Sequence, residues 1–157
     1  MNSGRANKRV LRDMKLLSQK DEYQSEIIDT KTITCIVNWP KDTVYENGQW
    51  KINIQFPDNY PFKSPSVGFL DKIYHPNVDF GSGSICLNVL NTAWTPIYTV
   101  EHIVDTFIPQ LLTYPNPDDP LNIEAANLLN DDLESFNKKA LEFVTINNHS
   151  QSKKWSC

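Results

Sequence analysis

The hydrophobic residues of this chain recur with two different periods, which divide it into a helical start, a central sheet and a helical end. Between residues 8 and 18 the apolar side chains Val10, Leu11, Met14 and Leu17 lie three or four positions apart or side by side. Such spacing places them on one face of an α-helix. We therefore predict an amphipathic first helix, with its charged residues mostly off the apolar stripe: Lys8, Arg9, Arg12 and Asp13.

A period of two follows and predicts strands. Ile33, Cys35, Val37 and Trp39 alternate with polar residues, and the stretch from Trp50 to Phe56 repeats the alternation more cleanly. Two half-buried strands are expected here, paired antiparallel through the turn between residues 41 and 48. Residues 25–29 and 66–70 are expected to add one strand before and one after this pair. The predicted sheet is therefore a four-stranded antiparallel meander.

Residues 71–98 show no sustained period, and so long an irregular segment in a compact domain is usually functional. The helical period returns from Thr99 to Leu112, where Pro109 predicts a kink because it removes one backbone hydrogen bond. The stretch TYPNPDDPLN, residues 113–122, holds three prolines and is expected to be a rigid exposed loop.

Two more helices are predicted after this loop, at residues 123–130 and 131–146. Asp131 is the expected N-cap of the second helix, with Glu134 completing a capping box. The fold class is thus α+β: an N-terminal helix, the meander sheet, a long active-site loop and about three C-terminal helices. We expect one domain over residues 1–148 and a flexible tail over 149–157.

Composition narrows the possible functions. The 157 residues are 39% hydrophobic, enough for one substantial core, and the net charge of −4 offers no basic field for nucleic acid. No apolar run is long enough to span a bilayer and the N-terminus does not resemble a secretion signal, so we expect an unsecreted protein with no membrane partner. The three cysteines, Cys35, Cys86 and Cys157, form no pattern typical of a disulfide framework or a zinc finger.

Cys86 is the candidate for chemistry among the three cysteines. Cys35 sits between Ile33 and Val37 on the apolar face of a strand and is expected to be a core residue. Cys86 follows a Gly-Ser-Gly-Ser turn inside the irregular segment, and its surroundings fit a nucleophile and a buried structural cysteine equally well. His75 suggests a Cys-His pair, although a histidine before proline is more often structural. A metal site of Cys86, His75 and Asp79 lacks a recognisable fourth ligand.

Five motifs in fixed order are more specific than any one residue. They are YPFKSP at 60–65, IYHPNV at 73–78, SICLNV at 84–89, WTP at 94–96 and PNPDDPL at 115–121. In this order and spacing the chain resembles a ubiquitin-conjugating enzyme from the basic helix to about Val144. Within that family it is most similar to the H-type branch, through YPFKSP, WT, FIPQLL and YPNPxDPL.

The resemblance implies a function. Enzymes of this family accept ubiquitin as a thioester from an ATP-dependent activating enzyme and pass it to a lysine amine, usually with a ligase holding the substrate. By resemblance Cys86 is the acceptor thiol, Asn77 supports the oxyanion or the loop beside it, Asp119 orients the lysine, and His75 is a structural brace. Many relatives carry an acidic residue where this chain has Asn88, so a role for Asn88 in deprotonating lysine is in doubt.

The resemblance also implies partners. Phe62 and Pro96 match loop positions that contact ligases, and Lys8, Arg9 and Arg12 match the helix that meets activating enzyme and ligase. Ile97 stands where many relatives carry a small alanine, which is expected to alter the choice of ligase. The expected partners are ubiquitin, the activating enzyme, a ligase and lysine-bearing substrates, and the chain is expected to act as a monomer in the cytoplasm or nucleus. No metal and no tightly bound cofactor is expected, since ATP is used by the activating enzyme. The alternatives are a carrier for a ubiquitin-like modifier, a non-catalytic scaffold, and a Cys-His hydrolase.

Overall fold

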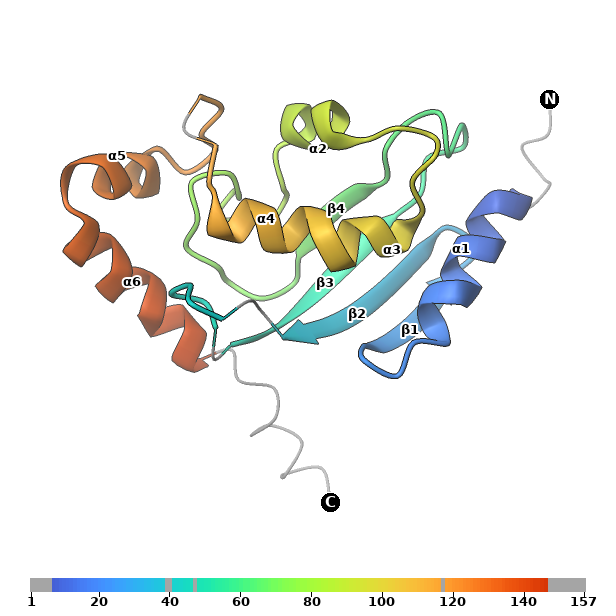
Figure 1. Ribbon diagram of the computed structural model, residues 1–157, viewed down its shortest axis with the longest axis horizontal. Helices are drawn as coiled ribbons and strands as arrows, with labels where there is room; N and C mark the ends of the chain where they lie inside the picture. Colours follow the sequence, from blue (N-terminus) through green and yellow to red (C-terminus); the bar gives the residue numbers. More distant parts are fainter. Residues whose placement is uncertain (1–6, 39–40, 47, 117, 147–157) are drawn as a thin grey trace, which may run out of the picture.

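The fold is an antiparallel sheet with helices packed along one face and at both ends (Figure 1), as given by a computed structural model. The structure describes residues 7–38, 41–46, 48–116 and 118–146. Its strands follow one another in the order β1-β2-β3-β4, each antiparallel to the next, which confirms the predicted meander. The strands are β1 (Gln24–Asp29), β2 (Thr32–Asn38), β3 (Gln49–Gln55) and β4 (Ser66–Phe69).

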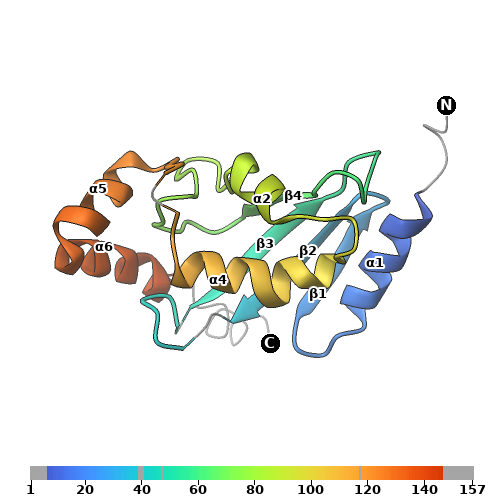
Figure 2. The same ribbon diagram turned by 45° about the horizontal axis from the view of Figure 1, so that its top comes forward.

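The helices lie along one face of this sheet and at the two ends of the molecule (Figures 1 and 2). In chain order they are α1 (Lys8–Ser18), α2 (Leu87–Ala93), α3 (Val100–His102), the π-helical turn η1 (Ile103–Phe107), α4 (Ile108–Thr113), α5 (Ile123–Asp131) and α6 (Leu133–Ile146). The continuous helix formed by α3, η1 and α4 crosses one face of the sheet, as both views show (Figures 1 and 2). Helix α1 lies beside β1 at one end of the molecule, and α5 and α6 lie at the other.

The core lies between the sheet and the long helix. The register pairs Cys35 with Ile52 and Ile52 with Phe69, so apolar side chains of neighbouring strands stand on one face. All three are buried, as are Ile103 and Ile108 of the helix above them. Cys35 is fully buried, and burial raises the pKa of its thiol to about 12, so the prediction of a core cysteine is confirmed.

Three details of the fold differ from the sequence-based expectations. Asp13 is not on the polar side of α1 but fully buried, because it receives hydrogen bonds from other segments. The segment 71–98 is not irregular throughout, since it contains α2, whose seven residues are too few to show a helical period. The N-cap of α6 is Asp132 and not Asp131: the Asp132 carboxylate accepts from the backbone N–H of Ser135 at 3.1 Å and from its hydroxyl at 2.6 Å.

A π-helical turn precedes Pro109, the residue at which the sequence predicts a kink. Proline has no N–H to donate to the carbonyl four residues earlier, that of Asp105. One residue before the proline, Ile108 donates to the carbonyl of Ile103, five positions back, which widens the turn. The predicted tail over residues 149–157, with Cys157, lies outside the described residues, as does Trp39.

Candidate active site

Cys86 is the last residue of a short extended segment and the N-cap residue of helix α2. The amide of Ile85 donates to the carbonyl of Val67 on β4 at 3.0 Å, and the amide of Cys86 donates to the carbonyl of Asn77 at 3.1 Å. The segment is thus held on one side by the sheet and on the other by the HPN motif, residues 75–77. Cys86 itself is 8% exposed. The residue is therefore almost fully covered by the rest of the protein.

The turn before Cys86 depends on one glycine. Gly83 has a φ of 80°, and a Cβ added to it would stand 1.9 Å from the carbonyl oxygen of Phe69. Its carbonyl accepts from the amide of Phe69 at 2.7 Å, which ties the turn to β4. The predicted close approach of backbone at this turn is confirmed at Gly83, where only glycine fits.

Asp79 closes the same turn from its other side. Its carboxylate accepts from the hydroxyl of Ser82 at 2.7 Å and from the backbone N–H of Ser82 at 2.8 Å. These two hydrogen bonds, the hydroxyl first, lower the pKa of Asp79 because they favour the charged form. The described residues contain no group of three or more His, Cys, Asp or Glu side chains that could hold a metal ion.

Asn77 connects Cys86 to the proline-rich loop. The side chain is fully buried, and its amide nitrogen donates to the carbonyls of Asn116 at 2.7 Å and Asp119 at 3.1 Å. Its amide oxygen accepts from the backbone N–H of Asn116 at 2.8 Å. Both amide protons are therefore engaged in holding the loop. Of the two roles implied by the resemblance, this geometry favours loop support over direct contact with an oxyanion.

A second anchor holds the far end of the same loop. The carbonyl of Pro76 accepts from the amides of Leu121 at 2.8 Å and Asn122 at 3.0 Å. Consecutive residues of the HPN motif thus fix both ends of a loop that begins some 40 positions later in the chain. Between these anchors the side chains of Asp118 and Asp119 are exposed. The loop therefore presents two exposed acidic residues between backbone positions that are hydrogen-bonded to the HPN motif.

His75 completes the motif as a fully buried residue. Its Nδ1 accepts from the backbone N–H of Asn77 at 3.0 Å, and its Nε2 lies 2.9 Å from the carbonyl oxygen of Leu111. This pattern assigns the proton to Nε2 in a neutral ring, because a carbonyl can only accept. Burial lowers the pKa of His75 to about 4, against the opposing effect of the Leu111 carbonyl. With both nitrogens bonded to backbone, the ring is not placed to deprotonate Cys86.

The residues on either side of Cys86 differ in burial. Ile85 is buried, whereas Leu87 is 48% exposed. Leu87 is the first residue of α2 and faces outward there. Asn88 is exposed, and its carbonyl accepts from the hydroxyl of Thr92 at 2.8 Å. The neutral amide side chain of Asn88 is therefore available at the surface beside the cysteine.

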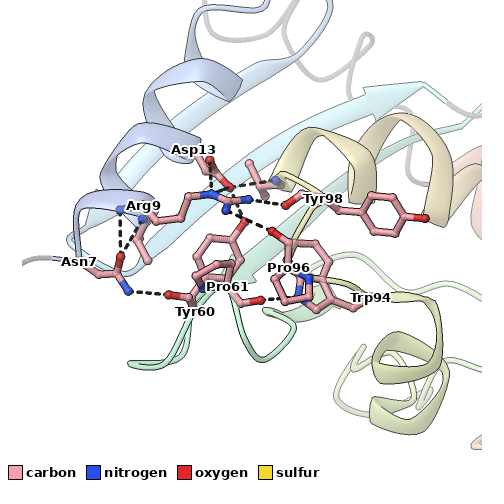
Figure 3. A network of polar contacts seen from close by, with 10 residues as sticks. Asn7, Arg9, Asp13, Tyr60, Pro61, Trp94, Pro96 and Tyr98 are labelled. Carbon is pink, nitrogen blue, oxygen red and sulfur yellow. Dashed lines mark hydrogen bonds and ion pairs between the residues drawn. The ribbon is translucent and has the colours of Figure 1, made fainter.

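The sequence-based candidates for partner contact lie on two loops and on α1. Phe62 is 79% exposed and Ile97 is 88% exposed, and Pro96 next to it is exposed as well. Lys8 and Arg12 are exposed on α1. The side chain of Arg9 is only 22% exposed and donates hydrogen bonds within the protein (Figure 3), so it is not available in the way that Lys8 and Arg12 are.

Some residues of this region were not singled out from the sequence. Asn116 is one, since both its amide and its carbonyl bond to the Asn77 side chain, while its own side chain accepts from the amide of Asp118 at 2.9 Å. An asparagine between two prolines does signal such a turn. The carbonyl of Leu111, which accepts a hydrogen bond from Nε2 of His75, has no signal in the sequence, because backbone acceptors are not marked by residue type.

Comparison with known proteins finds relatives over most of the chain. The family model described as "Ubiquitin-conjugating enzyme" matches residues 9–144. The chain is 46% identical over 143 residues to the ubiquitin-conjugating enzyme E2 5 of Arabidopsis thaliana, covering 90% of this chain and 76% of the relative. It is 47% identical over 133 residues to the ubiquitin-conjugating enzyme E2-24 kDa of Saccharomyces cerevisiae, covering 83% of this chain and 60% of that relative.

A solved structure shows the same arrangement of elements. The E2 domain of a Toxoplasma gondii ubiquitin-conjugating enzyme superimposes with a TM-score of 0.77 at 28% sequence identity, covering 88% of this chain and 95% of the other. The superposition thus covers most of both chains. It confirms the predicted α+β architecture, from the first helix through the meander sheet to the C-terminal helices.

Proposed function

The chain belongs to the ubiquitin-conjugating enzyme family, and from this premise we propose that Cys86 is the thiol that carries ubiquitin. Membership of this family makes the protein a transferase of the ubiquitin cascade, and the proposal assigns the catalytic and positioning roles to particular residues. The observation that carries it is the position of Asn77, which bonds to the amide of Cys86 and to the carbonyl of Asp119, 42 positions away. Asn77 thus joins the other two candidate residues of the site, Cys86 through its backbone carbonyl and Asp119 through its side-chain amide.

In the loading step, the thiolate of Cys86 attacks the carbonyl carbon of the ubiquitin C-terminus, which is held as a thioester on the activating enzyme. The new carbon–sulfur bond forms as the old one breaks, and the activating enzyme's cysteine leaves as a thiolate. The step exchanges one thioester for another and needs no oxidant or metal. A thiol suits the task because its acyl ester remains reactive toward amines.

In the transfer step, a lysine amine attacks the thioester carbonyl, the sulfur of Cys86 leaves, and the nitrogen loses a proton. The exposed carboxylate of Asp119 is supported as the group that orients the amine, because its backbone is fixed by Asn77. A lysine entering this site also loses solvent, which lowers its pKa and favours the nucleophilic neutral amine. Asn88 contributes a neutral hydrogen-bonding group where many relatives carry a charge, so we assign it no part in proton removal.

The partners follow from the same premise. Ubiquitin, an activating enzyme and a ligase are implied by the family, and lysine-bearing substrates are proposed with them. Phe62 and Ile97 are supported as the apolar part of the docking surface by their exposure, and Lys8 and Arg12 as its basic part. We further propose an H-type enzyme acting as a monomer in the cytoplasm or nucleus. FIPQLL and YPNPDDPL support the branch, and the lack of a disulfide framework fits a reducing compartment.

Catalysis as proposed uses only side chains of this chain, with ATP consumed at the activating enzyme. No helix in the described part of the chain is both long enough and apolar enough to cross a membrane.

The test is a charging assay with activating enzyme, ATP and ubiquitin, resolved with and without reductant. We expect a reductant-sensitive adduct with the wild type and with Cys35→Ala, which retains Cys86, and none with Cys86→Ala. A parallel panel with ubiquitin-like modifiers and their own activating enzymes decides the identity of the passenger. An adduct that persists in Cys86→Ala would refute the assignment.

A further inference from the structure

The buried carboxylate of Asp13 receives hydrogen bonds from three different segments. Nε of Arg9 lies 3.2 Å from its Oδ1, and the hydroxyl of Tyr60 and the amide of Val100 both donate to its Oδ2, the amide at 3.3 Å. Asp13 is fully buried on α1, Tyr60 belongs to the loop that carries Phe62, and Val100 begins the helix that follows Ile97. A single side chain therefore joins α1 to both loops of the proposed docking surface (Figure 3).

Only a carboxylate satisfies this set of neighbours. All three partners are donors, and an ionised carboxylate offers acceptors alone, with room for about four hydrogen bonds. Burial and the bond to Asp13 raise the pKa of Tyr60, which keeps its hydroxyl protonated as a donor. The N-cap residue of α3, Thr99, makes no side-chain capping bond, so Asp13 takes the place of a cap for Val100.

Arg9 extends the network to the second loop. Beyond its pair with Asp13, its guanidinium donates to the carbonyl of Pro96 at 3.3 Å and to the carbonyl of Tyr98. Its charged group also lies 5.4 Å from the centre of the Tyr60 ring. The loop that carries Ile97 is thus held through its backbone on either side of that residue.

Two more contacts close the arrangement. Asn7, the N-cap of α1, accepts from the amide of Arg9 at 2.9 Å and donates to the carbonyl of Tyr60 at 2.8 Å. The indole N–H of Trp94 donates to the carbonyl of Pro61 at 2.8 Å, which links the two loops directly. Each segment is therefore bonded to the other two, as Figure 3 shows.

We propose that Asp13 is a positioning residue for partner docking, which sets the spacing between the loop of Phe62 and the loop of Ile97. The inference rests on the proposed function, since it assumes that these loops meet the activating enzyme and the ligase. Asp13 is fully buried, so a partner docking on the surface does not reach its side chain, and it is remote in the chain from Cys86. Its loss therefore changes how well a partner binds, and not the reactivity of the thioester once it is formed.

The test compares the wild type with Asp13→Asn, whose amide presents donors to a site filled with donors. The activating enzyme is the probe, and the apparent KM and kcat of thioester transfer are measured together with discharge of the preformed thioester by free lysine. We expect the KM to rise about fivefold or more, with kcat and discharge within about twofold of the wild type. Tyr60→Phe, which removes one donor and keeps the ring, changes the KM in the same direction by a smaller factor.

Asp105→Asn is the matched control. Asp105 likewise links two elements, because its carboxylate pairs with Lys20 and accepts from the hydroxyl of Tyr23, both in the segment between α1 and β1. These two contacts involve neither the loop of Phe62 nor the loop of Ile97. Its KM is expected to stay within about twofold of the wild type, with thermal unfolding measured for all variants. If Asp13→Asn does not fold, the KM of Tyr60→Phe tests the positioning role in its place, and an unchanged KM there overturns it.

The outcomes separate the two proposals. The positioning role is overturned if the folded Asp13→Asn variant has an unchanged KM. It is also overturned if this variant loses kcat and lysine discharge by the same factor as it gains KM. Either result leaves Cys86 as the ubiquitin carrier. Failure of the wild type to form any thioester overturns the proposed function itself. A raised KM in Asp105→Asn equal to that of Asp13→Asn would show that general loosening is the cause, and this too overturns the positioning role.

Discussion

The amide nitrogen of Cys86 lies 3.1 Å from the carbonyl oxygen of Asn77 and donates a hydrogen bond to it. The side chain of the same asparagine binds the loop that carries Asp119. A nucleophile and a carboxylate from distant parts of the chain are thus held through one residue. Substitutions at Asn77, in the loop of Asp119 and in the segments that support them therefore have distinct expected effects.

Replacing Asn77 by alanine removes three hydrogen bonds to Asn116 and Asp119 and is expected to release the loop. Charging of Cys86 should persist, while discharge to free lysine slows by about tenfold to a hundredfold, because the carboxylate loses its fixed position. Hydrogen exchange at the amides of Leu121 and Asn122 should quicken at the same time. Slow discharge with unchanged exchange would instead favour direct oxyanion stabilisation by the amide.

Asp119→Asn and Asp118→Asn form a matched pair of exposed loop variants. We expect Asp119→Asn to slow discharge to lysine by about tenfold and Asp118→Asn to leave it within about twofold, since only Asp119 has its backbone held by Asn77. Single-turnover discharge of the preformed thioester measures both. Equal effects of the two substitutions would mean that loop charge matters and the position of Asp119 does not.

The buried His75 predicts how stability depends on pH. Its pKa is about 4 in the folded protein and 6.5 in a solvated histidine, so the unfolded chain binds the proton more readily. The stability contributed by the neutral ring is therefore complete above pH 6.5 and is lost as the pH falls toward 4, on the order of 3 kcal/mol in all. Urea unfolding from pH 7 to pH 4 should show this slope in the wild type and a shallower one in His75→Gln. An NMR titration of His75 near 6.5 would contradict the burial argument.

Gly83→Ala is expected to destabilise the protein by about 2 kcal/mol or more, because its positive φ and the nearby Phe69 carbonyl leave no place for a Cβ. Gly81→Ala is the control, since its Cβ would meet only the Asp79 carboxylate at 3.6 Å. That variant should lie within about 0.5 kcal/mol of the wild type. Chemical denaturation measures both, and a Gly83→Ala variant as stable as Gly81→Ala would show that the turn can move.

Sequence periodicity predicted the sheet well because its apolar residues alternate over whole strands, as from Trp50 to Phe56. The same reasoning missed α2, since only Val89 and Leu90 of its seven residues are buried. It also misplaced Asp13, because nothing in a one-dimensional pattern shows that Tyr60 and Val100 donate to it. Tertiary hydrogen bonds, and not the local pattern, decide where that charge lies.

The sequence predicted the site residues that act through their side chains and not those that act through their backbone. Cys86, Asn77 and Asp119 were selected through motifs, and the structure brings their backbones together. The anchors at Pro76 and Leu111 act through carbonyl oxygens, which every residue has, so no motif could mark them. Arg9 was expected at the surface with Lys8 and Arg12, yet its bonds to Asp13 and Pro96 draw it inward.

The central claim is that Cys86 carries ubiquitin through its side-chain sulfur, and the Cys86→Ser variant tests it most directly. A serine oxygen at this position forms an ester in place of a thioester, so the bond changes while its location does not. After charging with activating enzyme and ATP, intact-mass measurement should find one ubiquitin on each protein. The wild-type adduct should be cleaved by reductant, and the serine adduct should resist reductant but be cleaved by mild alkali. A wild-type adduct that survives reductant, or a serine adduct that survives alkali, would place ubiquitin on a lysine and contradict the claim.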